Sequence, residues 1–116
     1  MKELEAKLTA ELRRGVLQIA VLALMRRPTY GYQLGKDLAD HGLETEEGTL
    51  YPILRRLEQQ GLCESSWDTG GNRPRKYYRT TDQGRETLES LLATFEKIGV
   101  ALAGVIGADT GSDDDD

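Results

Sequence analysis

The chain has 116 residues and a mass of 12.9 kDa, which suits one compact domain, and its mean hydropathy of -0.53 with 30% charged residues indicates a soluble globular protein. Its formal net charge is -5, but residues 1–108 hold 15 basic and 15 acidic side chains, so the whole deficit lies in Asp109 and residues 113–116. One cysteine and one histidine exclude an intrachain disulfide and a Cys/His zinc site, which needs about four ligands. We expect no metal ion, no cofactor and no catalysis, because the chain also lacks a Gly-rich phosphate loop and a convergent carboxylate pair.

The first apolar segment predicts a buried helix. Residues 12–25 lack the alternation of a strand, and their apolar side chains cover most of a helical wheel. We expect one face to pack on the domain's own core and another, carrying Val16 and Ile19, to meet a partner chain or the last helix. The densest apolar stretch spans ten residues, whereas a membrane span needs about 20, so we expect no membrane association.

A short second helix is predicted at about residues 30–40. Thr29 is a candidate N-terminal cap, Leu34 and Leu38 have the spacing of an inward face, and Gly42 provides the stop.

A third helix is predicted from Thr45, as a candidate cap, to Gln60. Pro52 lacks the N–H that a helix interior uses, so either the helix starts later, near Thr49, or it bends at the proline. At about 100° per residue, one face of this helix has the spacing of core packing. That face carries Leu50, Ile53, Leu54 and Leu57, and the opposite face carries Gly48, Pro52, Arg55 and Gln59, flanked by Tyr51 and Arg56.

A β-hairpin follows, with strands at residues 62–67 and 73–80 around a Gly-containing turn. Cys63 is expected to be a small buried hydrophobe. Tyr77 and Tyr78 point to opposite faces of their strand, so one is expected in the core and the other outside it. The sequence leaves open which is which.

Thr81 is expected to cap a last helix over residues 82–107. Such a helix would be close to 40 Å long, which is more than a small domain covers. We therefore expect a second copy of the chain to bury its apolar stripe. The dimerisation residues that we predict, including the two on the first helix, are Val16, Ile19, Leu88, Leu92, Phe95 and Leu102.

The order of these elements predicts a mainly α-helical fold with a small β-hairpin, that is, a winged helix-turn-helix plus a long C-terminal dimerisation helix. The third helix would be the reader helix, which contacts DNA, and the loop at residues 67–73 would be the wing. The winged domain would span residues 1–80, with residues 1–11 as an N-terminal extension of the first helix. The dimerisation helix would span residues 81–107, and residues 108–116 would form an acidic flexible tail.

Three segments resemble the PadR family of transcriptional regulators. They are residues 47–58 (EGTLYPILRRLE) followed by Gly61 and Leu62, residues 29–34 (TYGYQL), and residues 72–78 (NRPRKYY). The resemblance implies a homodimeric regulator, usually a repressor, with a short C-terminal dimerisation helix.

Cations gather on the proposed wing, where Arg73, Arg75, Lys76 and Arg79 occur without an acid among them. Duplex DNA presents a dense row of phosphates, so such a wing adds affinity with little sequence preference. On the reader helix an arginine can reach a guanine edge, while hydroxyl groups can donate to phosphate. The DNA contacts that we predict are Thr49, Tyr51, Arg55, Arg56, Arg73, Arg75, Lys76 and Tyr32; for Tyr51, packing across the domain is an equal alternative, and Tyr30 is expected in the core.

The sequence thus predicts a cytoplasmic homodimer that represses transcription by binding an inverted-repeat operator in double-stranded DNA. A small-molecule effector that releases it is a compatible addition. The alternative is a protein-interaction module whose basic wing meets an acidic protein surface.

Overall fold

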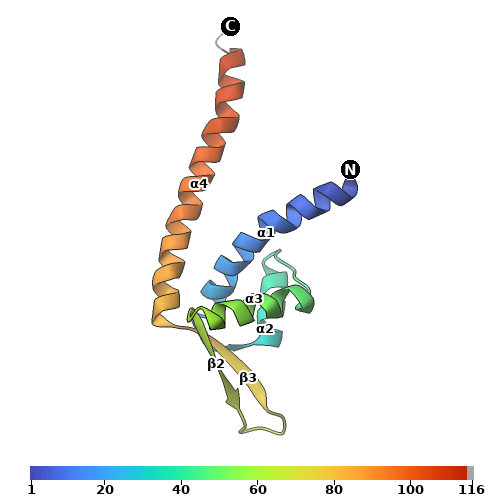
Figure 1. Ribbon diagram of the computed structural model, residues 1–116, viewed down its shortest axis with the longest axis vertical. Helices are drawn as coiled ribbons and strands as arrows, with labels where there is room; N and C mark the ends of the chain where they lie inside the picture. The colour runs from blue at the N-terminus through green and yellow to red at the C-terminus, as the bar shows by residue number, and fades with distance from the viewer. Residues whose placement is uncertain (115–116) are drawn as a thin grey trace.

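The computed structural model describes the backbone of residues 1–114 and the side chains of residues 1–108. Its elements follow the order α1 (Lys2–Leu24), β1 (Thr29–Tyr30), α2 (Gly31–Asp40), α3 (Glu47–Gln59), β2 (Cys63–Asp68), β3 (Arg75–Thr80) and α4 (Asp82–Asp114). Figure 1 shows α2, α3 and the hairpin grouped at one end of the molecule, with α1 and α4 diverging from that group. The molecule is therefore elongated, measuring 70 × 34 × 24 Å. The predicted winged helix-turn-helix with a long C-terminal helix is confirmed.

The small sheet has three strands where the sequence predicts two. Its order is β1-β3-β2, with Tyr30 opposite Tyr77 and Thr29 opposite Tyr78. The extra strand is only two residues long, and it forms because β3 presents a free edge to the segment before α2. Thr29 is therefore a strand residue and not the predicted helix cap.

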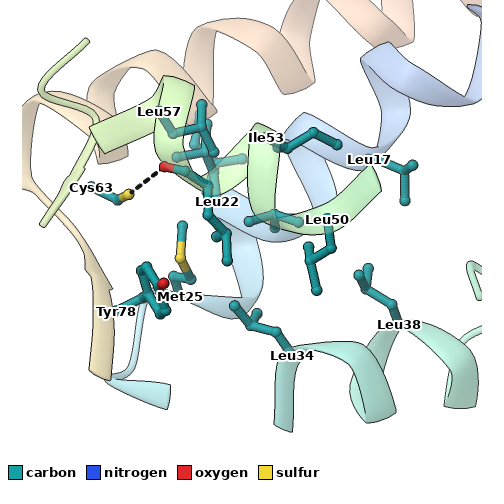
Figure 2. Packing of buried hydrophobic residues seen from close by; sticks show 13 residues of the cluster. Leu17, Leu22, Met25, Leu34, Leu38, Leu50, Ile53, Leu57, Cys63 and Tyr78 are labelled. Carbon is teal, nitrogen blue, oxygen red and sulfur yellow. Dashed lines mark hydrogen bonds between the residues drawn. The ribbon is translucent and has the colours of Figure 1, made fainter. Parts of the chain in front are cut away.

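The core lies between α1, α2, α3 and the inner face of the hairpin (Figure 2). All four residues of the predicted inward face of α3 are buried, as are the two of α2, so both periodicity predictions are confirmed. Cys63 is also buried, donates a weak hydrogen bond to the Leu54 carbonyl at 3.8 Å, and has a pKa raised to about 11, chiefly by burial. Between the two tyrosines, Tyr78 enters the core at 6% exposure.

The start of α3 differs from prediction. The α3 helix begins at Glu47, between the two predicted starts, and Pro52 lies inside it. Thr45 does not cap this helix, because its hydroxyl donates instead to the Leu43 carbonyl at 2.8 Å. By contrast, Thr81 does cap α4: its hydroxyl oxygen accepts the N–H of Gly84 at 3.0 Å.

The C-terminal helix is longer than its apolar pattern predicts. It continues past Gly107 to Asp114, whereas residues 2–11, expected as an extension of the first helix, belong to α1. The predicted tail at residues 108–116 is therefore helical through Asp114, and its last two residues lie outside the described part of the chain. An apolar pattern marks where a helix packs and does not mark where the helix ends, so it does not register the last turns of α4.

The predicted dimerisation residues occupy different environments. Val16 and Ile19 on α1 are half-buried, and Ile19 packs against the core. The prediction for Leu88 is corrected: the side chain is only 3% exposed and belongs to the core of its own chain, because the first turns of α4 pack on the winged domain. Beyond that point α4 carries a stripe of exposed apolar side chains, formed by Leu92, Phe95, Ile98, Leu102 and Val105 at 46–65% exposure.

This stripe also gives α4 the composition of a membrane helix. Over Asp82–Ala108 the helix is long and apolar enough to cross a membrane by length and composition alone, with a mean hydropathy of 1.6 in its most apolar window. Glu96 and Lys97 lie in the middle of that stretch. Charged side chains are costly at the centre of a bilayer.

Candidate nucleic-acid interface

The outer face of α3 carries the predicted reader residues. Tyr51, Arg55 and Arg56 are exposed, whereas the opposite face of the helix is sealed into the core. Of the two roles that the sequence left open, packing is observed: the hydroxyl end of Tyr51 lies against the first residue of α2, while the side chain stays 37% exposed. There is room for it because that residue is Gly31, where a Cβ atom would lie 2.8 Å from the tyrosine oxygen.

The wing is the tip of the β2–β3 hairpin, which projects away from the end of α4 (Figure 1). Arg73 and Arg75 are exposed there, whereas Lys76 is half-buried. The Lys76 ammonium lies 5.6 Å from the ring centroid of Tyr78 and 6.0 Å from that of Trp67. Cation–π attraction to two rings restricts where this charge can point.

Reader helix and wing converge through Lys76. Tyr51, Arg55, Lys76 and Tyr78 line one small pocket of about 220 Å³, together with Glu58. The Glu58 carboxylate accepts a hydrogen bond of 2.5 Å from the Ser65 hydroxyl, so it ties α3 to β2. Two cations, one from the reader helix and one from the wing, thus flank the same depression.

A larger cleft of about 740 Å³ lies between the wing and the start of α2. Tyr32 and Gln33 line it from the side of α2, and the wing supplies Trp67 opposite them. Tyr32 is 74% exposed and Trp67 is 63% exposed. The predicted contacts that also line this cleft are Tyr51, Arg73, Arg75 and Lys76. The cleft therefore combines aromatic surface with positive charge, which is the combination that nucleic-acid interfaces use.

The base of the wing is braced against the segment before α2. Tyr30 stacks on Tyr77 with ring centroids 4.1 Å apart, and their hydroxyl groups are hydrogen-bonded. The Tyr30 hydroxyl is also 3.4 Å from the Asp68 carboxylate, and the Arg75 guanidinium lies 5.0 Å from its ring centroid. The hydrogen bond with Tyr30 raises the pKa of Tyr77. Tyr30, expected in the core, is half-buried in this brace.

Not every predicted cation is available to a partner. Arg79 forms an ion pair with Glu64, a contact that raises the pKa of Arg79. The free charge of the wing therefore resides in Arg73, Arg75 and Lys76.

Two predicted contacts stand apart from the cleft. Thr49 lies at a groove between the start of α3 and the first half of α1, and Arg56 lines none of the pockets described above. Conversely, Trp67 and Gln33 line the cleft although the sequence interpretation does not select them as contacts. The alternation of side chains along a strand could have indicated Trp67. It follows Cys63 and Ser65 at intervals of two residues, so its side chain lies on the core-facing side of β2, beyond the end of the core.

These features define a winged-helix DNA-binding protein, with a reader helix and a cationic wing on one face. Residues 21–90 match the family described as "Transcriptional regulator PadR-like family". The chain belongs to this family, and it is a DNA-binding transcriptional regulator.

Similar proteins support this membership. A PadR family transcriptional regulator from Eggerthella lenta has 47% sequence identity and a TM-score of 0.82, over 90% of this chain and 94% of that one. A PadR-like transcriptional regulator from Bacillus cereus has 29% identity and a TM-score of 0.74, over 83% and 96% of the two chains. The transcriptional regulator Rv3488 of Mycobacterium tuberculosis is 36% identical over 75 residues, which cover 65% of this chain and 70% of that protein.

Proposed function

We propose that the protein is a cytoplasmic, homodimeric repressor that places α3 in the major groove of each half-site of an inverted-repeat operator. The observation that carries the proposal is the convergence of Arg55 and Lys76 on one depression, because it joins reader helix and wing into one cationic surface. In this arrangement Arg55 contacts a base edge, and Arg73, Arg75 and Lys76 neutralise phosphates on either side. Tyr32 and Tyr51 donate to the backbone, and Thr49 and Arg56 contact it at the periphery.

A second copy of the chain is the proposed cover of the exposed α4 stripe. Leu92, Phe95 and Leu102 recur at a spacing of three and seven residues, which keeps them on one side of a helix. Val16 and Ile19 of α1 extend that surface. A membrane is a poorer cover, because it would bury Glu96 and Lys97 together with the stripe.

A small molecule bound between α1 and α4 of the two copies is the proposed releasing effector. It would act by favouring one angle between the helices over another. The residues of this chain are proposed to bind and to switch, and to catalyse no reaction.

Replacing Arg75 with alanine tests the phosphate contacts of the wing. Each lost phosphate contact should lower the slope of log affinity against log salt by about 0.9. Preference among sequences should stay as in the wild type, because phosphates carry no sequence information. The measurement is a salt titration of binding to operator and random duplexes. Lys7→Ala, which removes a cation from α1, should leave the slope unchanged; equal slopes for Arg75→Ala and Lys7→Ala would contradict the assignment.

Replacing Arg55 with alanine tests base recognition. A bidentate contact from arginine to guanine discriminates by about 1–3 kcal/mol, so the ratio of operator to random affinity should fall by roughly 5- to 150-fold. Competitive binding against random duplex measures that ratio. Gln59→Ala alters the same face one turn later and serves as the control. The reading role of Arg55 would be refuted by an unchanged ratio alongside uniformly weaker binding.

A further inference from the structure

The start of α4 is tied to the turn that ends α3. The Thr81 hydroxyl donates to the Gly61 carbonyl at 2.7 Å and accepts the Gly84 N–H at 3.0 Å. The Thr81 backbone N–H also donates to the Leu62 carbonyl at 3.1 Å. Two hydrogen bonds of Thr81 therefore join the start of α4 to the turn after the reader helix, and the third caps the first turn of α4 itself.

Close packing reinforces this joint. Gly84 is buried against the Leu62 carbonyl, and a Cβ atom at this position would lie 2.7 Å from Thr80 Cγ2 as well as inside contact distance of that carbonyl. The first turn of α4 thus has no space in which to tilt toward the α3–β2 turn.

The end of α1 meets the same joint from the other side. Thr80 is 1% exposed; its N–H donates to the Met25 carbonyl at 2.8 Å and its hydroxyl donates to the Leu22 carbonyl at 2.7 Å. Arg85 adds a contact of 3.2 Å from its guanidinium to the Arg26 carbonyl. Consecutive threonines therefore fix α4 to both α1 and α3.

A small change of angle at this joint moves the distant part of α4 by several ångströms. From Gly84 to Gly99, near the middle of the exposed stripe, the helix spans about 22 Å at about 1.5 Å per residue. A tilt of about 10° at the joint moves that midpoint by about 4 Å. The distance between successive base pairs is about 3.4 Å, so a small change of angle alters which half-site spacing a dimer fits.

We propose that Thr81 is a positioning residue that sets the separation of the two reader helices, and hence the operator spacing that the dimer selects. The inference rests on the proposed dimer. Thr81 acts through the angle between α3 and α4 and touches no nucleic acid itself.

The test compares Thr81→Val, which keeps the shape of the side chain and removes the hydroxyl, with Thr81→Ser, which keeps the hydroxyl. Wild-type protein first selects duplexes from a random pool, and the selected inverted repeat is then resynthesised with one or two base pairs added or removed at its centre. Wild type and Thr81→Ser should bind the best spacing about tenfold or more tightly than its neighbours, because half-sites must match the dimer's geometry. Thr81→Val should lose that preference or shift it to another spacing. Leu38→Val, a core change in α2, controls for lost stability and should leave the spacing profile unchanged.

A second readout needs no DNA. Nitroxide labels on Gln59→Cys report the distance between the two α3 helices of the dimer, and the buried Cys63, with its pKa raised to about 11, stays unlabelled at neutral pH. Thr81→Val should broaden or shift this distance, whereas Thr81→Ser should not. An unchanged label distance and an unchanged spacing profile in Thr81→Val would overturn the inference about Thr81 but would not contradict the proposed repressor function. If the wild type selects no inverted repeat, operator binding is refuted, and the distance between the labels still tests whether Thr81 sets the separation of the α3 helices. If no distance between two labels is detected, both proposals are overturned.

Discussion

Replacing Gly84 with alanine is expected to cost about 3 kcal/mol of folding free energy, and more if the backbone cannot move. The added methyl group would meet the Leu62 carbonyl and Thr80 Cγ2, both of which lie in the joint between α3, β3 and α4. Neither is the movable end of a long side chain, so relief requires the helix itself to shift. Thermal unfolding followed by circular dichroism should register a midpoint lower by about 12 °C or more.

Gly104→Ala is the matched control in the same helix. A Cβ atom at Gly104 meets nothing within 4 Å, and the position lies on the side of α4 away from the apolar stripe. Alanine there should stabilise the protein by about 0.5–1 kcal/mol, because glycine is the poorer helix former. Opposite signs for the two substitutions are the expected result. Equal effects would mean that Gly84 is under no packing constraint.

Replacing Leu102 with glutamate is expected to convert the proposed dimer to a monomer. Leu102 is 56% exposed in the single chain and belongs to the stripe that a second copy would cover. Burying an unpaired carboxylate there would cost several times the thermal energy. Operator affinity should then fall by about 100-fold or more, because linking two half-site contacts raises affinity by that order. Sedimentation velocity and quantitative gel shifts measure the two effects.

Val100→Glu controls for the added charge. Val100 is 70% exposed. It lies about 160° around the helix from Leu102, so the dimer should tolerate a charge there. A Leu102→Glu protein that stays dimeric would exclude this stripe as the interface. A membrane-bound pool of wild-type protein that both substitutions release would favour the bilayer as the cover instead.

Periodicity predicted the core of the winged domain because each helix presents one continuous apolar face. The inward faces of α2 and α3 are buried as predicted, and the hairpin forms where turn residues interrupt the apolar pattern. The two-residue β1 escaped prediction because β3, the strand with which it pairs, is distant in the chain. Leu88 was misplaced for a related reason: an apolar stripe does not record whether its own chain or a second copy covers it.

At the candidate site, the sequence predicted which residue types are present better than it predicted how they are arranged. The cations of the wing follow from composition, but the pairing of Arg79 with Glu64 depends on cross-strand register, and so does the burial of Tyr78 rather than Tyr77. Trp67 was missed because neither its residue type nor its position in the chain shows that it is exposed and lines the cleft. The net charge of -5 likewise described the acidic C-terminal end and not the face where Arg55, Arg73, Arg75 and Lys76 gather.

DNA reading by α3 and the wing is best tested by the salt dependence and stoichiometry of binding between the wild-type protein and a duplex selected from a random pool. We expect two chains per duplex, an inverted repeat in the selected sequence, and a log–log slope of several units at about 0.9 per neutralised phosphate. Binding that is independent of salt, or no selected sequence at all, would contradict a DNA-reading role for this face of the molecule.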